Sequence, residues 1–568
     1  PLRTVDAIDE ARRSIEAQIP VVDPVIVAWD GHLPEVTTTI DLVSASIVLE
    51  DDSEIPCTVE ERTVACHRTL PIGYHRLVLD GGAHHAHVFS APVRATHGPE
   101  HVSGLIAPMY SLRGEVDPGI GTLHDLADLA DVCRDAGIEV VGTLPLLAAF
   151  DDEPSPYAPA SRRAWNEVFA DLTALPDWEA GPPAATGDPA WVDYEGAGGA
   201  IRDEIARYAA HVARVPRLRD QVEAFGSANP EIVRYASFRA IADHEGRNWR
   251  AWPQGAAGDA AREVYHLTAQ WIMHRQLATM SETLRARGQY LYLDLPIGCH
   301  PDGYDIWDAP ELFAPASLGA PPDTLFVGGQ DWGLPATIPA LSRLDGHQVF
   351  RKAISHQLSV AGLLRIDHVM GIHRTWWVPH GRGATQGAYV AQPTDEMFAV
   401  ICIESVRADA AVVGENLGTV PPEIRTALRE HDLIGMVVPQ DGFGEAAPTD
   451  LIAISSHDTP PFLGWWNGVD IDDLVDLGEF DEERATHERS VRADSRAALT
   501  ERFGTDDPER ILDGLLAWMS ETPAAVSLAT MDDLVHERRR QNVPGTYWER
   551  PNWRLRHADT VTALGEDP

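Results

Sequence analysis

Carboxylic acid residues stand at or just beyond the ends of short, largely apolar runs, and this pattern is the strongest chemical signal in the sequence. Four residues show this pattern: Asp294, Asp367, Glu415 and Asp458. A carboxylate can serve as a nucleophile, a general acid or base, or a ligand of a hard cation. Carboxylates that lie close together raise one another's pKa and cost stability, so a purely structural role explains such a group poorly.

The residues around these carboxylates favour chemistry on sugars over chemistry on a metal ion. Arg365 precedes Asp367 by two residues and is expected to keep it ionised, as a nucleophile must be. Glu415 follows an apolar run and a glycine, a setting suited to a general acid. His368 and His457 could hydrogen-bond sugar hydroxyls. Taken alone, Arg365 and Asp367 could also be a buried ion pair that fixes a strand end.

Helical patterns alternate with apolar strand patterns over most of the chain. Helices are expected at 123–136, 270–287, 349–360, 394–408 and 421–433, and strands at 139–145, 290–294, 363–368, 411–415, 434–438 and 451–454. This alternation predicts a parallel sheet. In a (β/α)8 barrel the carboxyl ends of all strands meet at one mouth, so the four carboxylates would converge there.

The predicted fold class is α/β, a (β/α)8 TIM barrel with helical insertions, preceded by a small all-β sandwich. Residues 1–20 resemble a short amphipathic helix, and residues 21–95 contain short strand patterns separated by turn formers. The barrel is expected over 96–568, with inserted helical subdomains at about 160–265 and 468–530.

The amino-acid composition restricts the classes of molecule that the protein can bind and the compartment in which it is expected. The 568 residues carry a formal net charge of −42, which argues against nucleic acid or an anionic membrane as a partner. Five scattered cysteines without a C-x-x-C motif indicate neither a disulfide framework nor a thiolate zinc site. No leader pattern and no run of about 18 apolar residues occurs, so a cytoplasmic location is expected.

A series of motifs then occurs in order between residues 111 and 556. They are Ser111-Leu112-Arg113, Gly119-Ile120-Gly121, Ser155-Pro156-Tyr157, Asp294-Leu295-Pro296-Ile297, Gly329-Gln330-Asp331-Trp332-Gly333-Leu334-Pro335, Leu364-Arg365-Ile366-Asp367-His368, Gly414-Glu415-Asn416-Leu417-Gly418, His457-Asp458, Asn542-Val543-Pro544-Gly545-Thr546 and Pro551-Asn552-Trp553-Arg554. In these motifs the chain resembles the amylomaltases, the 4-α-glucanotransferases of glycoside hydrolase family 77, in particular the bacterial branch with an N-terminal β-domain.

The resemblance implies a retaining double displacement with Asp367 as nucleophile, Glu415 as acid/base and Asp458 as transition-state stabiliser. It also implies a set of substrate-binding residues: Arg365, His457, His368, Asp294, Tyr157, Trp332, Ser155 and Pro335. Donors and acceptors would be maltooligosaccharides and other α-1,4-glucans, with no cofactor and no metal, and the enzyme would be a monomer or homodimer. The alternatives are an α-glucan hydrolase of the same fold, a transferase with altered linkage or product specificity, and a catalytically silent glucan-binding protein.

Two features depart from the family pattern. Asn416 follows the acid/base residue where the family usually has Asp, and Asp117-Pro118 precedes Gly-Ile-Gly where an aromatic residue is usual. The polar stretch 180–198 and the charged stretch 470–501 match no family feature, so acceptor choice and product size are where this chain is expected to differ.

Overall fold

The computed structural model describes residues 20–565 except 180, 186, 324–325 and 440–443. Within them an eight-stranded parallel sheet has the order β17-β14-β11-β10-β9-β20-β19-β18. The strands are β9 (Val102–Ile106), β10 (Val140–Gly142), β11 (Tyr290–Leu295), β14 (Leu363–Ile366), β17 (Ala411–Gly414), β18 (Gly435–Val437), β19 (Asp450–Ala453) and β20 (Val526–Thr530). A parallel bridge between Val413 and Ile434 joins the two outer strands. The sheet is therefore a nearly closed barrel, as predicted.

Two strands of this barrel, β9 and β20, were not predicted. Their sequences, VSGLI and VSLAT, mix apolar residues with small and polar ones, so the strand pattern is weak, and in the structure the two strands pair in parallel. A Cβ atom at Gly104 would come within 2.8 Å of Leu528 Cδ1 and 2.9 Å of Val140 Cβ. The glycine is therefore needed for close packing inside the barrel, although it weakens the strand pattern in the sequence.

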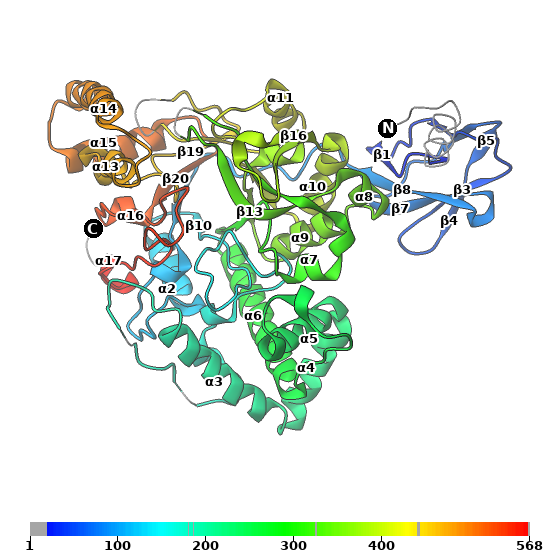
Figure 1. The fold of residues 1–568 in the computed structure, drawn as a ribbon, viewed down its shortest axis with the longest axis horizontal. Helices are drawn as coiled ribbons and strands as arrows, with labels where there is room; N and C mark the ends of the chain where they lie inside the picture. Colours follow the sequence, from blue (N-terminus) through cyan, green and yellow to red (C-terminus); the bar gives the residue numbers. More distant parts are fainter. Residues whose placement is uncertain (1–19, 180, 186, 324–325, 440–443, 566–568) are drawn as a thin grey trace.

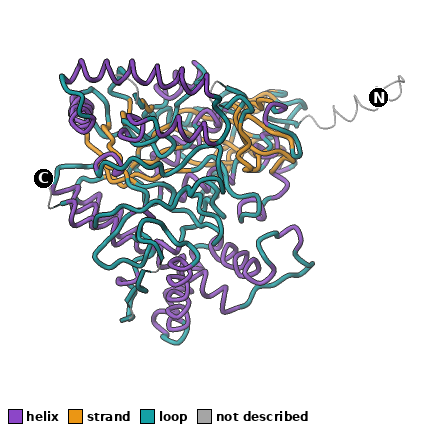
Figure 2. The backbone as a smooth tube through the Cα atoms, turned by 60° about the vertical axis from the view of Figure 1, so that its left-hand side comes forward, coloured by secondary structure: helices purple, strands orange, loops and turns teal. Residues whose placement is uncertain are grey.

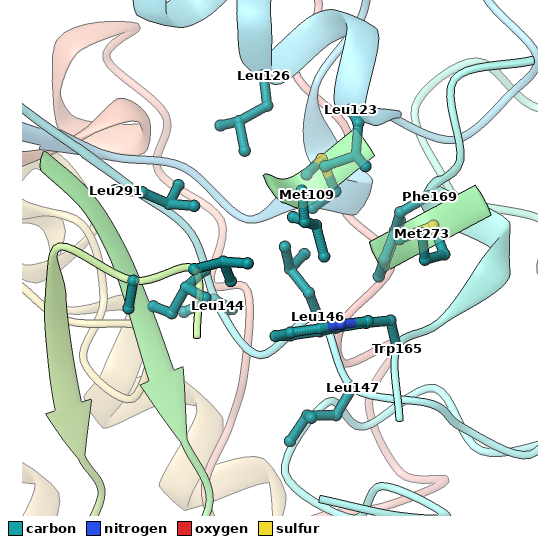
Figure 3. Close-up of a cluster of buried hydrophobic side chains, with 14 of the residues drawn as sticks. Met109, Leu123, Leu126, Leu144, Leu146, Leu147, Trp165, Phe169, Met273 and Leu291 are labelled. Carbon is teal, nitrogen blue, oxygen red and sulfur yellow. The ribbon is translucent and has the colours of Figure 1, made fainter. Parts of the chain in front are cut away.

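The expected helices cover the outside of the barrel: α2 (Leu123–Asp135), α6 (Ala260–Ala286), α9 (Gln348–Leu358), α10 (Thr394–Ala408) and α11 (Pro422–Glu430). Helix α6 begins at Ala260 rather than at residue 270, because the Asp259 side chain caps it by accepting a hydrogen bond from the N–H of Ala261. Figure 3 shows the apolar core formed where α2 and α6 meet the barrel, with Leu126 on one side and Met273 on the other.

Additional helices interrupt the barrel at two places. Helices α3 (Gly196–Val212), α4 (Pro216–Ala228) and α5 (Pro230–Glu245) precede α6, and α12 (Phe462–Asn467), α13 (Val469–Asp476), α14 (Glu482–Phe503) and α15 (Pro508–Glu521) separate β19 from β20. Figures 1 and 2 both show the first group below the strands. Near the approximate ends of the predicted insertions, residues 260–265 belong to α6 and 526–530 form strand β20, and the insertion bounds themselves stay a prediction.

A four-stranded antiparallel sheet in the order β13-β12-β15-β16 was also not predicted. Its strands are β12 (Phe313–Ala320), β13 (Gln330–Thr337), β15 (Arg374–Pro379) and β16 (Ala388–Ala391). It is built from the segments that follow β11 and β14, and it carries Trp332, Trp376 and Trp377. Trp332 and Trp377 pack against the same apolar cluster as Ile297, which follows β11, whereas Trp376 contacts Tyr389 on the opposite face of the sheet.

The N-terminal strands form two small sheets. One has the order β1-β8-β7-β3-β4 and the other β2-β6-β5. Their bounds are β1 (Val25–Trp29), β2 (Val36–Thr37), β3 (Ala45–Val48), β4 (Glu54–Pro56), β5 (Thr58–Glu60), β6 (Thr63–Ala65), β7 (Gly73–Leu79) and β8 (His84–Ala91). The sandwich is not purely antiparallel, because β1 pairs with β8 in parallel. The expected helix at 1–20 lies outside the described residues apart from Pro20, and the boundary at residue 95 stays a prediction.

The five-stranded N-terminal sheet docks against the barrel helix α10 through β1 and β8 (Figure 1). Val25 and Phe89 pack with Val400 and Ile403 of that helix in one buried apolar cluster. The hydroxyl of Tyr74 donates a hydrogen bond to Glu404 Oε1 at 2.6 Å, within the same contact. Among the described residues no helix is both long and apolar enough to cross a membrane.

Candidate active site

Three neighbouring barrel strands bring the first three carboxylates together. Asp294 of β11 pairs in register with Arg365 of β14, and Ile366 of β14 pairs with Gly414 of β17. Asp367 and Glu415 directly follow that last pair, and the N–H of Glu415 donates to the carbonyl of Ile366 at 3.0 Å. Because adjacent strands lie about 4.8 Å apart, the two carboxyl groups start from neighbouring backbone positions.

Arg365 bridges two of these carboxylates. Its Nη1 lies 2.6 and 2.7 Å from the two carboxylate oxygens of Asp294, and its Nη2 lies 3.0 Å from Oδ1 of Asp367. The side chain of Asp294 is only 1% exposed, whereas that of Asp367 is 21% exposed. Asp294 is therefore the buried partner that holds the guanidinium, and Asp367 is the carboxylate that faces the mouth.

The ionisation of Asp367 differs from the prediction. Burial raises the pKa of Asp367 to about 6, Asp294 and Glu415 add to this effect, and Arg365 opposes it. The expected lowering by Arg365 is thus outweighed by burial and by the neighbouring carboxylates. Asp367 is still ionised at neutral pH, but its pKa lies closer to neutral pH than the sequence indicated.

Backbone N–H groups orient Glu415. Its Oε2 accepts from the N–H of His368 at 2.9 Å and its Oε1 from the N–H of Leu417 at 2.7 Å. His368 adopts a left-handed conformation with φ of 47°, which is the local bend that follows Asp367. The Asn416 side chain accepts from the N–H of Met436 at 2.7 Å, so this unusual neighbour of Glu415 is bonded to strand β18.

Asp458 lies on the other side of the mouth, after β19. Its Oδ2 is 3.3 Å from His457 Nε2, and its Oδ1 accepts from the Asn542 amide at 2.8 Å. Burial opposes ionisation of Asp458, but His457 and Asn542 outweigh it and hold its pKa well below the usual range. Burial also disfavours the charged form of His457, yet Asp458 raises the pKa of this imidazole. The pair therefore favours an imidazolium beside an ionised carboxylate.

Tyr157 connects the two sides of the mouth. Its hydroxyl donates to Asp294 Oδ2 at 2.6 Å, and its ring stacks on His457 with centroids 4.7 Å apart. The N–H of Tyr157 donates to the hydroxyl of Ser155 at 3.3 Å, so Ser155 supports the loop that holds the tyrosine. A cavity lined by Asp294, Arg365 and His457, among others, lies at this position.

The remaining predicted residues occupy the rim. The indole of Trp332 contacts the His368 ring edge to face, with centroids 5.4 Å apart. Pro335 lies in β13 and pairs in register with Ser317 of β12. Its position relative to the mouth is therefore set by the β12–β13 pairing. Among the described residues, no group of three His, Cys, Asp or Glu side chains is arranged to hold a metal ion.

Two residues of the site were not singled out from the sequence. Asn542 binds Asp458, and its occurrence in the 542–546 motif was the signal available. Asp533 accepts from the Ser455 hydroxyl at 2.5 Å and from the N–H of Phe462 at 2.6 Å. It thereby ties together both ends of the loop that carries His457 and Asp458. Asp533 follows β20, a strand that the sequence did not reveal.

The barrel and its mouth place this chain among the (β/α)8-barrel enzymes, whose active sites lie at the carboxyl ends of the strands. A family model described as 4-alpha-glucanotransferase, glycoside hydrolase family 77, matches residues 107–561, and the MalQ N-terminal beta sandwich domain matches residues 21–92. The chain therefore belongs to this family and is a 4-alpha-glucanotransferase.

Individual relatives agree with this assignment. The 4-alpha-glucanotransferase of Mycobacterium tuberculosis is 33% identical over 556 residues, covering 86% of this chain and 76% of the relative. That of Haemophilus influenzae is 28% identical, covering 85% and 80%. The amylomaltase structure from Corynebacterium glutamicum has a TM-score of 0.86 at 22% identity, covering 99% and 91%. That from Streptococcus agalactiae in complex with acarbose has a TM-score of 0.67 at 21% identity, covering 82% and 98%.

Proposed function

We propose that this enzyme transfers α-1,4-glucan segments between maltooligosaccharides by a retaining double displacement, with Asp367 as nucleophile and Glu415 as acid/base. The observation that carries the proposal is the register of β14 and β17, which places these two residues side by side on adjacent strands. Retaining glycosidases need their two carboxyl groups only about 5–5.5 Å apart, whereas inverting enzymes leave room for a water molecule between them.

In the first step Glu415 protonates the glycosidic oxygen while Asp367 attacks the anomeric carbon, and the shortened glucan leaves. The N–H groups of His368 and Leu417 hold the Glu415 carboxyl in one orientation during this transfer. Arg365 stabilises the ionised nucleophile through one contact at 3.0 Å. It does not neutralise Asp367 fully, because the guanidinium makes two shorter contacts with Asp294.

Asp458 acts on the sugar ring as it flattens. Its half-exposed carboxylate is kept ionised by His457 and Asn542, so it can accept hydrogen bonds from sugar hydroxyls that strengthen in the transition state. His457, Tyr157 and Trp332 supply further contacts to the bound glucan, and the hairpin with Pro335 shapes the rim.

In the second step the hydroxyl of another glucan, deprotonated by Glu415, attacks the glycosyl-enzyme and restores Asp367. Transfer then depends on the acceptor sugar outcompeting water at the intermediate. The four-stranded sheet carries Trp332 and Trp377 on one face, and these rings provide aromatic surface of the kind that binds sugar rings. An α-glucan hydrolase of the same fold is the second candidate, since its carboxylates would be arranged in the same way.

Chromatography of the products from maltotriose tests the proposal. We expect glucose together with a ladder of longer oligosaccharides, and a loss of several orders of magnitude in turnover in Asp367→Asn and Glu415→Gln. Glucose and maltose alone, without longer products, would establish hydrolysis instead. Unchanged turnover in Asp367→Asn would exclude the nucleophile assigned here. Trapping of a covalent glycosyl-enzyme in Glu415→Gln with a fluoride donor would test the double displacement directly.

A further inference from the structure

Two cysteines of the N-terminal domain lie opposite each other at the open end of a β-hairpin. Strand β5 pairs with β6 in the register Thr58 with Ala65 and Glu60 with Thr63, with the turn between them. Cys57 directly precedes Thr58, and Cys66 directly follows Ala65. The next pair along this ladder is therefore Cys57 with Cys66, although nine positions separate them in the sequence.

The two side chains also point to the same face of the hairpin. Cys57, Val59 and Cys66 all pack against the apolar cluster that contains Val64. Directly opposite residues of antiparallel strands have Cα atoms about 4.5–5.5 Å apart. A disulfide spans Cα atoms about 4.4–6.8 Å apart, so the hairpin supplies the required distance without a change of fold.

Cys57 and Cys66 are more exposed to solvent than the other three cysteines of the chain. Cys57 and Cys66 are half-buried, whereas Cys133, Cys299 and Cys402 are buried, and all are free thiols in this structure. Burial raises the pKa of the Cys57 thiol to about 12, and the adjacent Cys66 thiol contributes to the shift. The two sulfur atoms thus lie close enough to influence each other, and Cys57 stays protonated at neutral pH.

We infer that Cys57 and Cys66 form a reversible disulfide when the enzyme meets a low-molecular-weight disulfide such as oxidised glutathione. The Cys66 thiolate attacks one sulfur of oxidised glutathione, forming a mixed disulfide and releasing one glutathione. The Cys57 sulfur then attacks the Cys66 sulfur, and its proton passes to the second glutathione as that leaves. Two cysteine thiols are oxidised and one oxidised glutathione is reduced to two glutathione molecules.

The new bond would join the two N-terminal sheets. The N–H of Cys57 donates to the carbonyl of Ala45 in the five-stranded sheet at 3.0 Å, whereas Cys66 directly follows strand β6 of the three-stranded sheet. The β5 hairpin lies at the end of the molecule remote from the barrel strands (Figure 1). Oxidation is therefore expected to stabilise the N-terminal domain and to leave glucanotransferase activity unchanged.

Thiol counting and peptide mapping on the full chain test this inference. The reduced protein should release two equivalents of chromophore from a chromogenic disulfide reagent, because Cys66 attacks the reagent and Cys57 then displaces its second half, and it should release none after treatment with oxidised glutathione. Trypsin cleaves after Arg62, between the two cysteines, so the oxidised protein should yield two peptides held together until a reductant is added. The intact mass should fall by about 2 Da, the two hydrogen atoms lost on oxidation.

Single variants provide matched controls. Cys57→Ser keeps Cys66 without its partner, so it should accumulate a mixed disulfide with glutathione that the wild-type protein does not retain, whereas Cys66→Ser keeps only the protonated Cys57 thiol and should react slowly. Wild-type protein that carries glutathione on both residues, or that forms covalent dimers through them, would overturn the inference. So would a linked peptide pair that persists in either single variant.

Discussion

The partly buried carboxylate of Asp367 leads to a quantitative prediction about stability. Burial raises its pKa from 3.8 to about 6. One pKa unit corresponds to about 1.4 kcal/mol, so ionised Asp367 opposes folding by about 3 kcal/mol at neutral pH. Asparagine has nearly the same shape and no charge, and Arg365 keeps Asp294 as its partner. Asp367→Asn should therefore be inactive and also more stable than the wild type, by up to about 3 kcal/mol.

The direction of the pH dependence follows from the raised pKa. The folded protein binds this proton more tightly than the unfolded chain, so the penalty is absent below about pH 4, where both states are protonated. It grows between about pH 4 and pH 6 and is complete above that range. The stability difference between Asp367→Asn and the wild type should accordingly be large at about pH 7.5 and smaller at about pH 5.

Urea unfolding followed by tryptophan fluorescence at several pH values measures this difference. Asp458→Asn is the matched control, because it also removes a carboxylate from the mouth but one whose ionised form His457 and Asn542 stabilise. Asp458→Asn should gain no stability at neutral pH. An Asp367→Asn variant that is less stable than the wild type at neutral pH, or whose gain does not shrink as the pH falls, would refute the reasoning.

Three further predictions concern activity. The kcat/KM for maltotriose should decrease as the pH falls through about 6, because Asp367 then becomes protonated; a pH profile that is flat from pH 7 to about pH 5 would contradict this. Tyr157→Phe removes a hydrogen bond to a charged group worth about 1.5–3 kcal/mol, so kcat/KM should fall about 10- to 100-fold in steady-state assays, with an unchanged circular dichroism spectrum. Asp533→Ala should lower kcat by loosening the loop of Asp458, and Ser455→Ala, which removes only one of the Asp533 contacts, should lower it less when both are assayed side by side.

The sequence allowed the barrel and its mouth to be predicted because these depend on local patterns. Residues 363–366 and 411–414 are apolar runs after recognisable helices, and the carboxylates at their ends are visible without a structure. Strand β20 mixes small and polar residues, so its pattern is weak and Asp533 behind it was missed. The main partner of Arg365 was also hidden, because Asp294 lies 71 residues away in the chain and meets it only through the pairing of β11 with β14.

The uneven closure of the barrel has a mechanical consequence. On one side Glu415 follows a ladder of four register pairs between β14 and β17, while on the other a single bridge and the Asn416 side chain join β17 to β18. The joint between β17 and β18 is therefore the less extensively paired part of the barrel wall beside Glu415. Because Asp367 and Glu415 directly follow β14 and β17, the spacing between these two carboxylates is set by the more extensively paired side of the barrel wall.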